Sequence, residues 1–175
     1  PTTRSLLVGY RVSAELIVSA AVGLGDVWVD DTHTWWSELR PAEAGRVELV
    51  RDGIDLLGAP WSARTRVHEY GGGAWWVHGG SVFFANWADQ RLYRLDEGAE
   101  APRPLTAAPP APAAWRYADG RVSPDGRWIV CVREEHPPPG YEAPDGAHVE
   151  ADNQLVAIDA QGGGELVVLH DELSP

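Results

Sequence analysis

A repeat with a period of about 47 residues constrains the fold of this chain more than any other feature of its sequence. Each copy has a glycine just before an apolar run, at Gly25, Gly73 and Gly120, which are 48 and 47 residues apart. Runs rich in Val, Leu and Trp alternate with clusters of Gly, Pro and Asp, a pattern typical of antiparallel strands joined by turns. Four such runs in a copy of this length are typical of a β-propeller blade. The sequence therefore predicts an all-β chain, a partial β-propeller of about three four-stranded antiparallel blades.

The boundaries of the three blades follow from the positions of the apolar runs. We expect the first blade at about residues 22–58, the second at about 66–107 and the third at about 115–170. The third copy is lengthened by a stretch at 134–152 that is rich in Pro, Gly and acidic residues. We expect this insertion to form a surface loop.

Three blades are fewer than a closed ring requires, which is roughly four to eight. Two open flanks would leave apolar blade faces and strand edges exposed. We therefore expect the rest of the ring to lie further along the same polypeptide. The alternative is that other chains complete it.

The composition excludes several classes of partner and cofactor. There are 14 Lys+Arg against 26 Asp+Glu, a net charge of −12, which argues against nucleic acid because binding to phosphates needs a basic surface. The single cysteine, Cys131, excludes an intramolecular disulfide and a cysteine-based zinc site, and the six His are too scattered for a metal motif. We therefore expect no cofactor and no metal, and we expect Cys131 to be an inert thiol in the core.

The sequence shows no sign of a membrane association. No apolar run is long enough to span a bilayer, and no basic segment followed by a long apolar stretch marks a secretory signal. We therefore expect no membrane partner and a cytoplasmic location. All 14 basic residues are Arg, and this Ala-rich composition is typical of a GC-rich bacterial genome.

Two motifs carry resemblances to known propellers. Ser123-Pro-Asp-Gly126 stands before an apolar strand and resembles the turn of the TolB-like repeat, in which Asp-Gly suits a tight turn and Pro fixes the backbone before it. The more specific segment is Arg64-Thr-Arg-Val-His-Glu-Tyr-Gly-Gly-Gly73, continued by residues 81–86 and 89–93. Together with residues 22–25, this segment resembles the first blades of the prolyl oligopeptidase family, in its acylaminoacyl-peptidase and dipeptidyl-aminopeptidase-like branch.

The resemblance runs from about Leu16 to Leu169, most of the chain. In that family a propeller precedes an α/β-hydrolase domain with a Ser–Asp–His triad and restricts access to short peptides. The resemblance therefore implies part of a serine exopeptidase or oligopeptidase, such as an aminopeptidase or acylaminoacyl peptidase. It implies a peptide substrate and, as partner, the α/β-hydrolase domain of the same polypeptide. The chain contains no Gly-x-Ser-x-Gly nucleophile elbow, so we expect no catalytic residue in it and a triad beyond Pro175.

Four charged residues before the three glycines are the candidate substrate-binding residues: Arg64, Arg66, His68 and Glu69. Glu69 could pair with the α-amino group of a peptide, and an Arg could bind a carbonyl or a carboxylate. The alternative interpretation is a blade-joining segment whose charges satisfy one another, with Gly71–Gly73 allowing two blades to approach closely.

Three other groups of residues have structural interpretations. The first group is the repeat-phased tryptophans, which we expect to pack between blades: Trp28, Trp35, Trp36, Trp75 and Trp76. The second is the acidic residues of the insertion, which match no calcium loop and should be solvated: Glu142, Asp145, Glu150 and Asp152. The third is His78-Gly-Gly-Ser81, which resembles an oxyanion-hole motif but lies between two apolar strands, and we expect a hairpin turn there.

A second function stays open at this point. A non-catalytic TolB-like propeller that acts as a protein-binding scaffold would suit the Ser123–Gly126 turn equally well. The Arg64–Gly73 segment favours the peptidase, because a scaffold does not require it.

Overall fold

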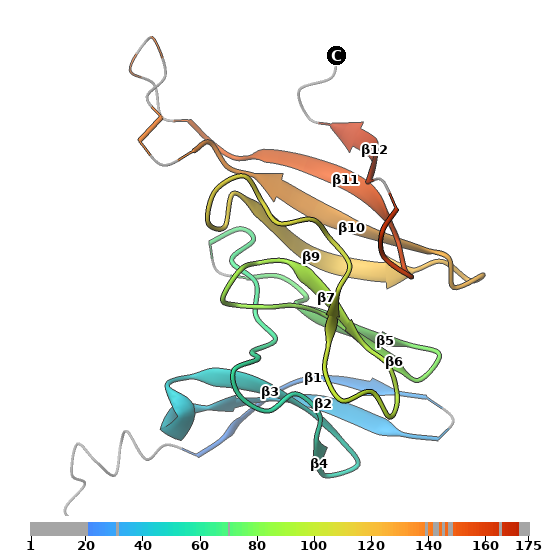
Figure 1. Ribbon diagram of the computed structural model, residues 1–175. Helices are drawn as coiled ribbons and strands as arrows, with labels where there is room; N and C mark the ends of the chain where they lie inside the picture. Colours follow the sequence, from blue (N-terminus) through green and yellow to red (C-terminus); the bar gives the residue numbers. More distant parts are fainter. Residues whose placement is uncertain are drawn as a thin grey trace, which may run out of the picture.

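The computed structural model describes residues 21–30, 32–69, 71–138, 140–141, 144, 146, 149–164 and 166–171. Its strands form three four-stranded antiparallel sheets, with the strand orders β1-β2-β3-β4, β5-β6-β7-β8 and β12-β11-β10-β9. Figure 1 shows the three sheets following one another from the blue to the red part of the chain. The predicted fold class, an all-β chain of three four-stranded blades, is confirmed.

The strand bounds in the first sheet are β1 (Gly23–Val29), β2 (Thr34–Arg40), β3 (Arg46–Arg51) and β4 (Ile54–Asp55). The second sheet holds β5 (Trp75–His78), β6 (Ser81–Ala85), β7 (Leu92–Leu95) and β8 (Arg103–Pro104). The third holds β9 (Trp115–Val122), β10 (Trp128–Glu135), β11 (Asp152–Asp159) and β12 (Val167–Asp171). A 3-10 helix, η1 (Pro41–Glu43), joins β2 to β3. No helix in these described residues is long and apolar enough to cross a membrane.

Within each sheet every strand pairs antiparallel with the next strand along the chain, and the connections after even-numbered strands gather at one end of the sheets (Figure 1, left). The longest pairing is between β10 and β11, from Trp128↔Asp159 to Glu135↔Asp152. Glu134 is therefore a strand residue, opposite Asn153, and the connection between the two strands lies at 136–151.

The core lies between the sheets in two clusters of buried residues. Neighbouring side chains on a strand point to opposite faces, so consecutive aromatic residues reach different clusters. In β5, Trp75 joins the cluster between the first and second sheets, with Trp35 and Leu49, and Trp76 joins the cluster that contains Tyr117. Trp35, Trp75 and Trp76 are at most 3% exposed and pack between blades as predicted, and the partly buried Trp28 packs against both clusters. Trp36 belongs to neither cluster, and its indole N–H donates to Glu38 at 2.9 Å.

A close approach between the second and third sheets requires a glycine. A Cβ atom at Gly120 of β9 would lie 2.1 Å from the indole ring of Trp76. The hydrogen atom of Gly120 therefore makes room for the largest side chain of the cluster between these sheets.

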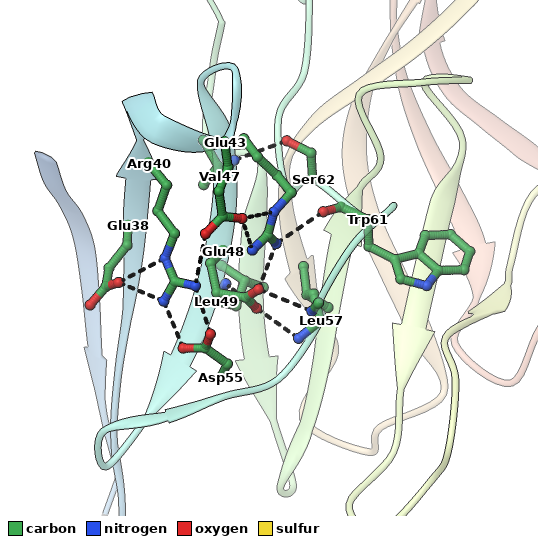
Figure 2. A network of polar contacts seen from close by, with 12 residues as sticks. Glu38, Arg40, Glu43, Val47, Glu48, Leu49, Asp55, Leu57, Trp61 and Ser62 are labelled. Carbon is green, nitrogen blue, oxygen red and sulfur yellow. Dashed lines mark hydrogen bonds and ion pairs between the residues drawn. The ribbon is translucent and has the colours of Figure 1, made fainter. Parts of the chain in front are cut away.

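A network of charged residues ties the first sheet to the segment that leads into the second sheet (Figure 2). Glu48 is fully buried, and its carboxylate accepts hydrogen bonds from the backbone N–H groups of Leu57 and Gly58, at 2.7 and 3.0 Å. The guanidinium of Arg46 lies 2.5 Å from the same carboxylate and donates to the carbonyl of Trp61 at 3.3 Å. Because a buried carboxylate needs such partners, Glu48 fixes the path of the chain just before the candidate site residues.

Candidate functional site

A cavity of about 880 Å³ opens at the end of the sheets where the connections after even-numbered strands gather. Three parts of the chain that are distant in sequence form its walls: the turn at 68–69, the segment 112–116, and the facing ends of β10 and β11 with their connection. Its lining residues are His68, Glu69, Pro112, Ala113, Ala114, Arg116, Glu134, His136, Pro137, Val149, Glu150, Ala151 and Asn153.

Two of the four predicted binding residues, His68 and Glu69, line this cavity. Both have positive φ angles, 55° and 60°, a conformation that non-glycine residues seldom adopt. The side chain of Glu69 is exposed, and no side chain among the described residues donates a hydrogen bond to its carboxylate. Glu69 is therefore a carboxylate available to a ligand in the cavity.

The other two, Arg64 and Arg66, lie against Trp87 instead. Their guanidinium carbons are each 4.3 Å from the centroid of the indole ring, which is the geometry of a cation–π contact. Arg64 borders a separate hollow of about 260 Å³ next to Gly71. Arg66 contributes to the cavity site through its backbone, because its carbonyl accepts a hydrogen bond from Arg116 at 3.1 Å.

Glu134 is the most buried charged residue in the cavity, with 4% of its surface exposed. Its Oε1 accepts a hydrogen bond from the backbone N–H of His68 at 2.6 Å and lies 3.4 Å from Nδ1 of the same residue. Its Oε2 lies 2.8 Å from Nε2 of His136 and 3.8 Å from the guanidinium of Arg116. This single carboxylate connects all three walls of the cavity.

Arg116 places a positive charge in the site. Burial lowers the pKa of its guanidinium from the ordinary value, and Glu134 and Glu69 act in the opposite direction. An arginine stays protonated through such a shift, so the positive charge persists beside both carboxylates.

Asn153 adds an unsatisfied acceptor on the strand next to Glu134. Its amide nitrogen lies 3.5 Å from the carbonyl of Ala151, whereas its Oδ1 is buried and has no hydrogen-bond partner among the described residues. Buried acceptors of this kind usually have a donor, so Oδ1 of Asn153 is a place for an N–H group of a ligand. With Glu69 and the exposed Glu150 on the same cavity, the site suits a ligand that carries a positive charge and hydrogen-bond donors.

Sequence reasoning missed Arg116, Glu134, His136 and Asn153. Glu134 and His136 are two residues apart, so an extended chain presents both side chains on one face, and this spacing is a signal for these two residues alone. The insertion predicted at 134–152 hides this pattern, because residues 134 and 135 are the last two residues of β10.

The other predicted groups lie elsewhere or are structural. Of the acidic residues of the insertion, Glu150 lines the cavity and Asp152 pairs with Glu135 in the sheet, while Glu142 and Asp145 lie outside the described residues. Within the described residues no three His, Cys, Asp or Glu side chains form a group that could hold a metal ion. The 78–81 segment is the turn of the β5–β6 hairpin, as predicted, because residues 78 and 81 are paired in register.

Comparisons with known proteins match the chain to solved peptidase structures. It is 40% identical to a puromycin-hydrolysing peptidase from Mycobacterium tuberculosis, with a TM-score of 0.75, and the match covers 89% of this chain and 25% of that one. It is 30% identical to puromycin hydrolase, with a TM-score of 0.78 over 94% of this chain and 27% of that one. A mutant of puromycin hydrolase complexed with PGG matches with a TM-score of 0.77 and the same identity and coverage. No protein-family model matches the chain, and no curated protein matches it.

The chain thus spans about a quarter of the length of these relatives, and that quarter consists of four-stranded blades. The segment that resembles the family, residues 64–73, carries two lining residues of the cavity. The chain therefore matches the β-propeller portion of peptidases of the prolyl oligopeptidase family.

Proposed function

We propose that this chain is the substrate-gating propeller portion of a serine peptidase, and that its cavity receives the free amino end of a short peptide. The catalytic serine, histidine and acid would lie in an α/β-hydrolase domain of the same polypeptide, the partner that the family resemblance implies. The chain itself would contribute binding and selection by size, and no catalytic group.

The observation that carries the proposal is the exposed carboxylate of Glu69 at the wall of an 880 Å³ cavity. An ammonium group bound there would gain a charge-assisted hydrogen bond, which is shorter and stronger than a neutral one. Oδ1 of Asn153 and the carboxylate of Glu150 offer further acceptors to the same ligand. A substrate whose amino group is blocked would bring neither the charge nor the donors.

The relatives support a peptidase in particular. Two of them are described as acting on puromycin, a molecule in which an amino acid with a free α-amino group is joined by an amide bond. We propose puromycin as a substrate of the full polypeptide for this reason. The Ser123–Gly126 turn, the motif shared with scaffold propellers, is explained by its own hydrogen bonds: Asp125 accepts from the Ser123 hydroxyl at 2.5 Å.

The test is the replacement Glu69→Gln in the full polypeptide that contains this chain. We expect the KM for puromycin to rise about 10- to 100-fold, the loss of one hydrogen bond to a charged group, about 1.5–3 kcal/mol. The inhibition constant of N-acetylpuromycin, which has no ammonium group, should stay within about threefold.

The matched control is Glu100→Gln, which removes an exposed carboxylate from the turn between β7 and β8, at the opposite end of the sheets. It should change neither the KM for puromycin nor the inhibition constant of N-acetylpuromycin. Equal effects of the Glu69 replacement on puromycin and on N-acetylpuromycin would contradict the proposal.

A further inference from the structure

The turn that presents Glu69 is strained. His68 and Glu69 both have left-handed backbone angles, and neither is a glycine. Consecutive residues in this conformation persist only where the surrounding structure holds them. One anchor is local: Val67 is fully buried, and the N–H of Gly71 donates to its carbonyl at 2.9 Å.

The second anchor comes from a distant strand. Glu134 of β10 accepts the backbone N–H of His68 at 2.6 Å, across 66 residues of sequence. Arg116, 3.8 Å from the same carboxylate, donates at 3.1 Å to the carbonyl of Arg66, two residues before His68. The Glu134–Arg116 pair therefore holds the backbone both before and at the strained turn.

Burial and hydrogen bonds fix the orientation of the Glu134 carboxylate. Its side chain is 6% exposed, and a carboxylate in that position must be hydrogen-bonded. The contact with Nε2 of His136 at 2.8 Å fixes its second oxygen, so the carboxylate has little freedom to turn toward a ligand. Glu69, in contrast, is exposed on the same cavity.

We propose that Glu134 is a positioning residue, which holds the His68–Glu69 turn so that the Glu69 carboxylate faces the amino end of the substrate. This inference rests on the proposed function of Glu69. It assigns to Glu134 an effect on substrate binding that passes through Glu69 and not through direct contact with the ligand.

The test is a double-mutant cycle in the full polypeptide. Glu134→Ala should raise the KM for puromycin about tenfold or more, with kcat and the inhibition constant of N-acetylpuromycin within about threefold. In a Glu69→Gln background, Glu134→Ala should raise the KM for puromycin by less than about twofold, because the carboxylate that Glu134 positions is already absent. Glu134→Gln keeps an oxygen that accepts the N–H of His68, and it should restore the KM to within about threefold of the wild-type value.

The matched control is Glu135→Ala. Glu135 follows Glu134 in β10, points to the opposite face and pairs with Arg133 at 3.0 Å. It should leave the KM unchanged, and the thermal unfolding of each variant shows that the propeller is folded.

The outcomes separate this inference from the proposed function. If Glu134→Gln is as harmful as Glu134→Ala and both effects persist in the Glu69→Gln background, Glu134 binds the amine directly and the positioning role is overturned. The positioning role is also overturned if Glu134→Ala weakens the binding of puromycin and of N-acetylpuromycin equally. If Glu69→Gln itself has no effect on puromycin, the proposed function fails first, and the positioning role falls with it.

Discussion

At the scale of single residues, the fold depends on a few charged groups whose desolvation on burial is compensated by several hydrogen bonds and ion pairs. Glu48 is the clearest example, because its fully buried carboxylate accepts the N–H groups of Leu49, Leu57 and Gly58 and faces Arg46 (Figure 2). No apolar or neutral side chain can satisfy the same set of donors.

Replacing Glu48 by Ala should therefore reduce the free energy of unfolding by about 3–5 kcal/mol, since it leaves Arg46 and three backbone donors without their acceptor. Urea denaturation followed by tryptophan fluorescence measures this. The control is Glu43→Ala, which removes the exposed partner of Arg46 and should cost less than about 1 kcal/mol. If the two variants lose the same free energy of unfolding, the burial of Glu48 is not the reason for its contribution to stability.

Cys131 gives a second prediction at this scale. The thiol is 1% exposed, and burial raises its pKa to about 12, so the thiolate that reacts with alkylating reagents is scarce at neutral pH. Iodoacetamide at pH 8 should leave Cys131 unmodified in the native protein and modify it in urea, as followed by peptide mass mapping. Rapid modification without denaturant would contradict a core position.

At the scale of strands and turns, the contact between neighbouring blades sets how closely they approach. Gly120→Ala would place a methyl carbon 2.1 Å from the Trp76 ring, which is a severe overlap. The replacement should therefore lower the free energy of unfolding by about 1–3 kcal/mol or more. The double variant with Trp76→Phe should recover part of the loss, because the smaller ring leaves room for the methyl group. Additive losses in the double variant, measured by thermal unfolding, would rule out this contact as the cause.

The β1–β2 hairpin makes a prediction about pH. Asp30 accepts the backbone N–H groups of Thr32 and His33, both at 2.8 Å, and these bonds lower its pKa from 3.8 to about 2. A carboxylate whose pKa is lowered by folding stabilises the folded state above its unfolded pKa and loses this effect as it is protonated. The stability difference between the wild-type protein and Asp30→Ala should thus be constant above about pH 5 and shrink as the pH falls from about 4 to 2. A difference that does not change over that interval would contradict the role of the ionised carboxylate.

At the scale of the whole molecule, the repeat and the alternation of side chains along strands predicted most of the fold. The opposite directions of Trp75 and Trp76 follow from the geometry of any strand, so their burial could be expected from the sequence. The candidate site could be predicted only in part. His68 and Glu69 stand in a recognisable segment, but Glu134 and Asn153 meet them through the packing of separate blades, and no local pattern records a contact across 66 residues.

The first sheet also presents apolar side chains to solvent. Leu24, Val27 and Val29 of β1 are 76%, 62% and 70% exposed in the structure, far more than the tryptophans of the inner faces. A patch of this kind is typical of a surface that another element covers. This agrees with the proposal that the chain works as part of a larger ring joined to a hydrolase domain.

The membership of this chain in a serine peptidase is tested most directly by the intact mass of the full polypeptide that contains it, before and after treatment with a fluorophosphonate probe of serine hydrolases. We expect a polypeptide several times heavier than the 19.0 kDa of this chain, which gains the mass of one probe molecule. A polypeptide of any size that gains no probe, while a known serine hydrolase is labelled in the same experiment, would contradict it and favour a propeller that acts as a binding scaffold.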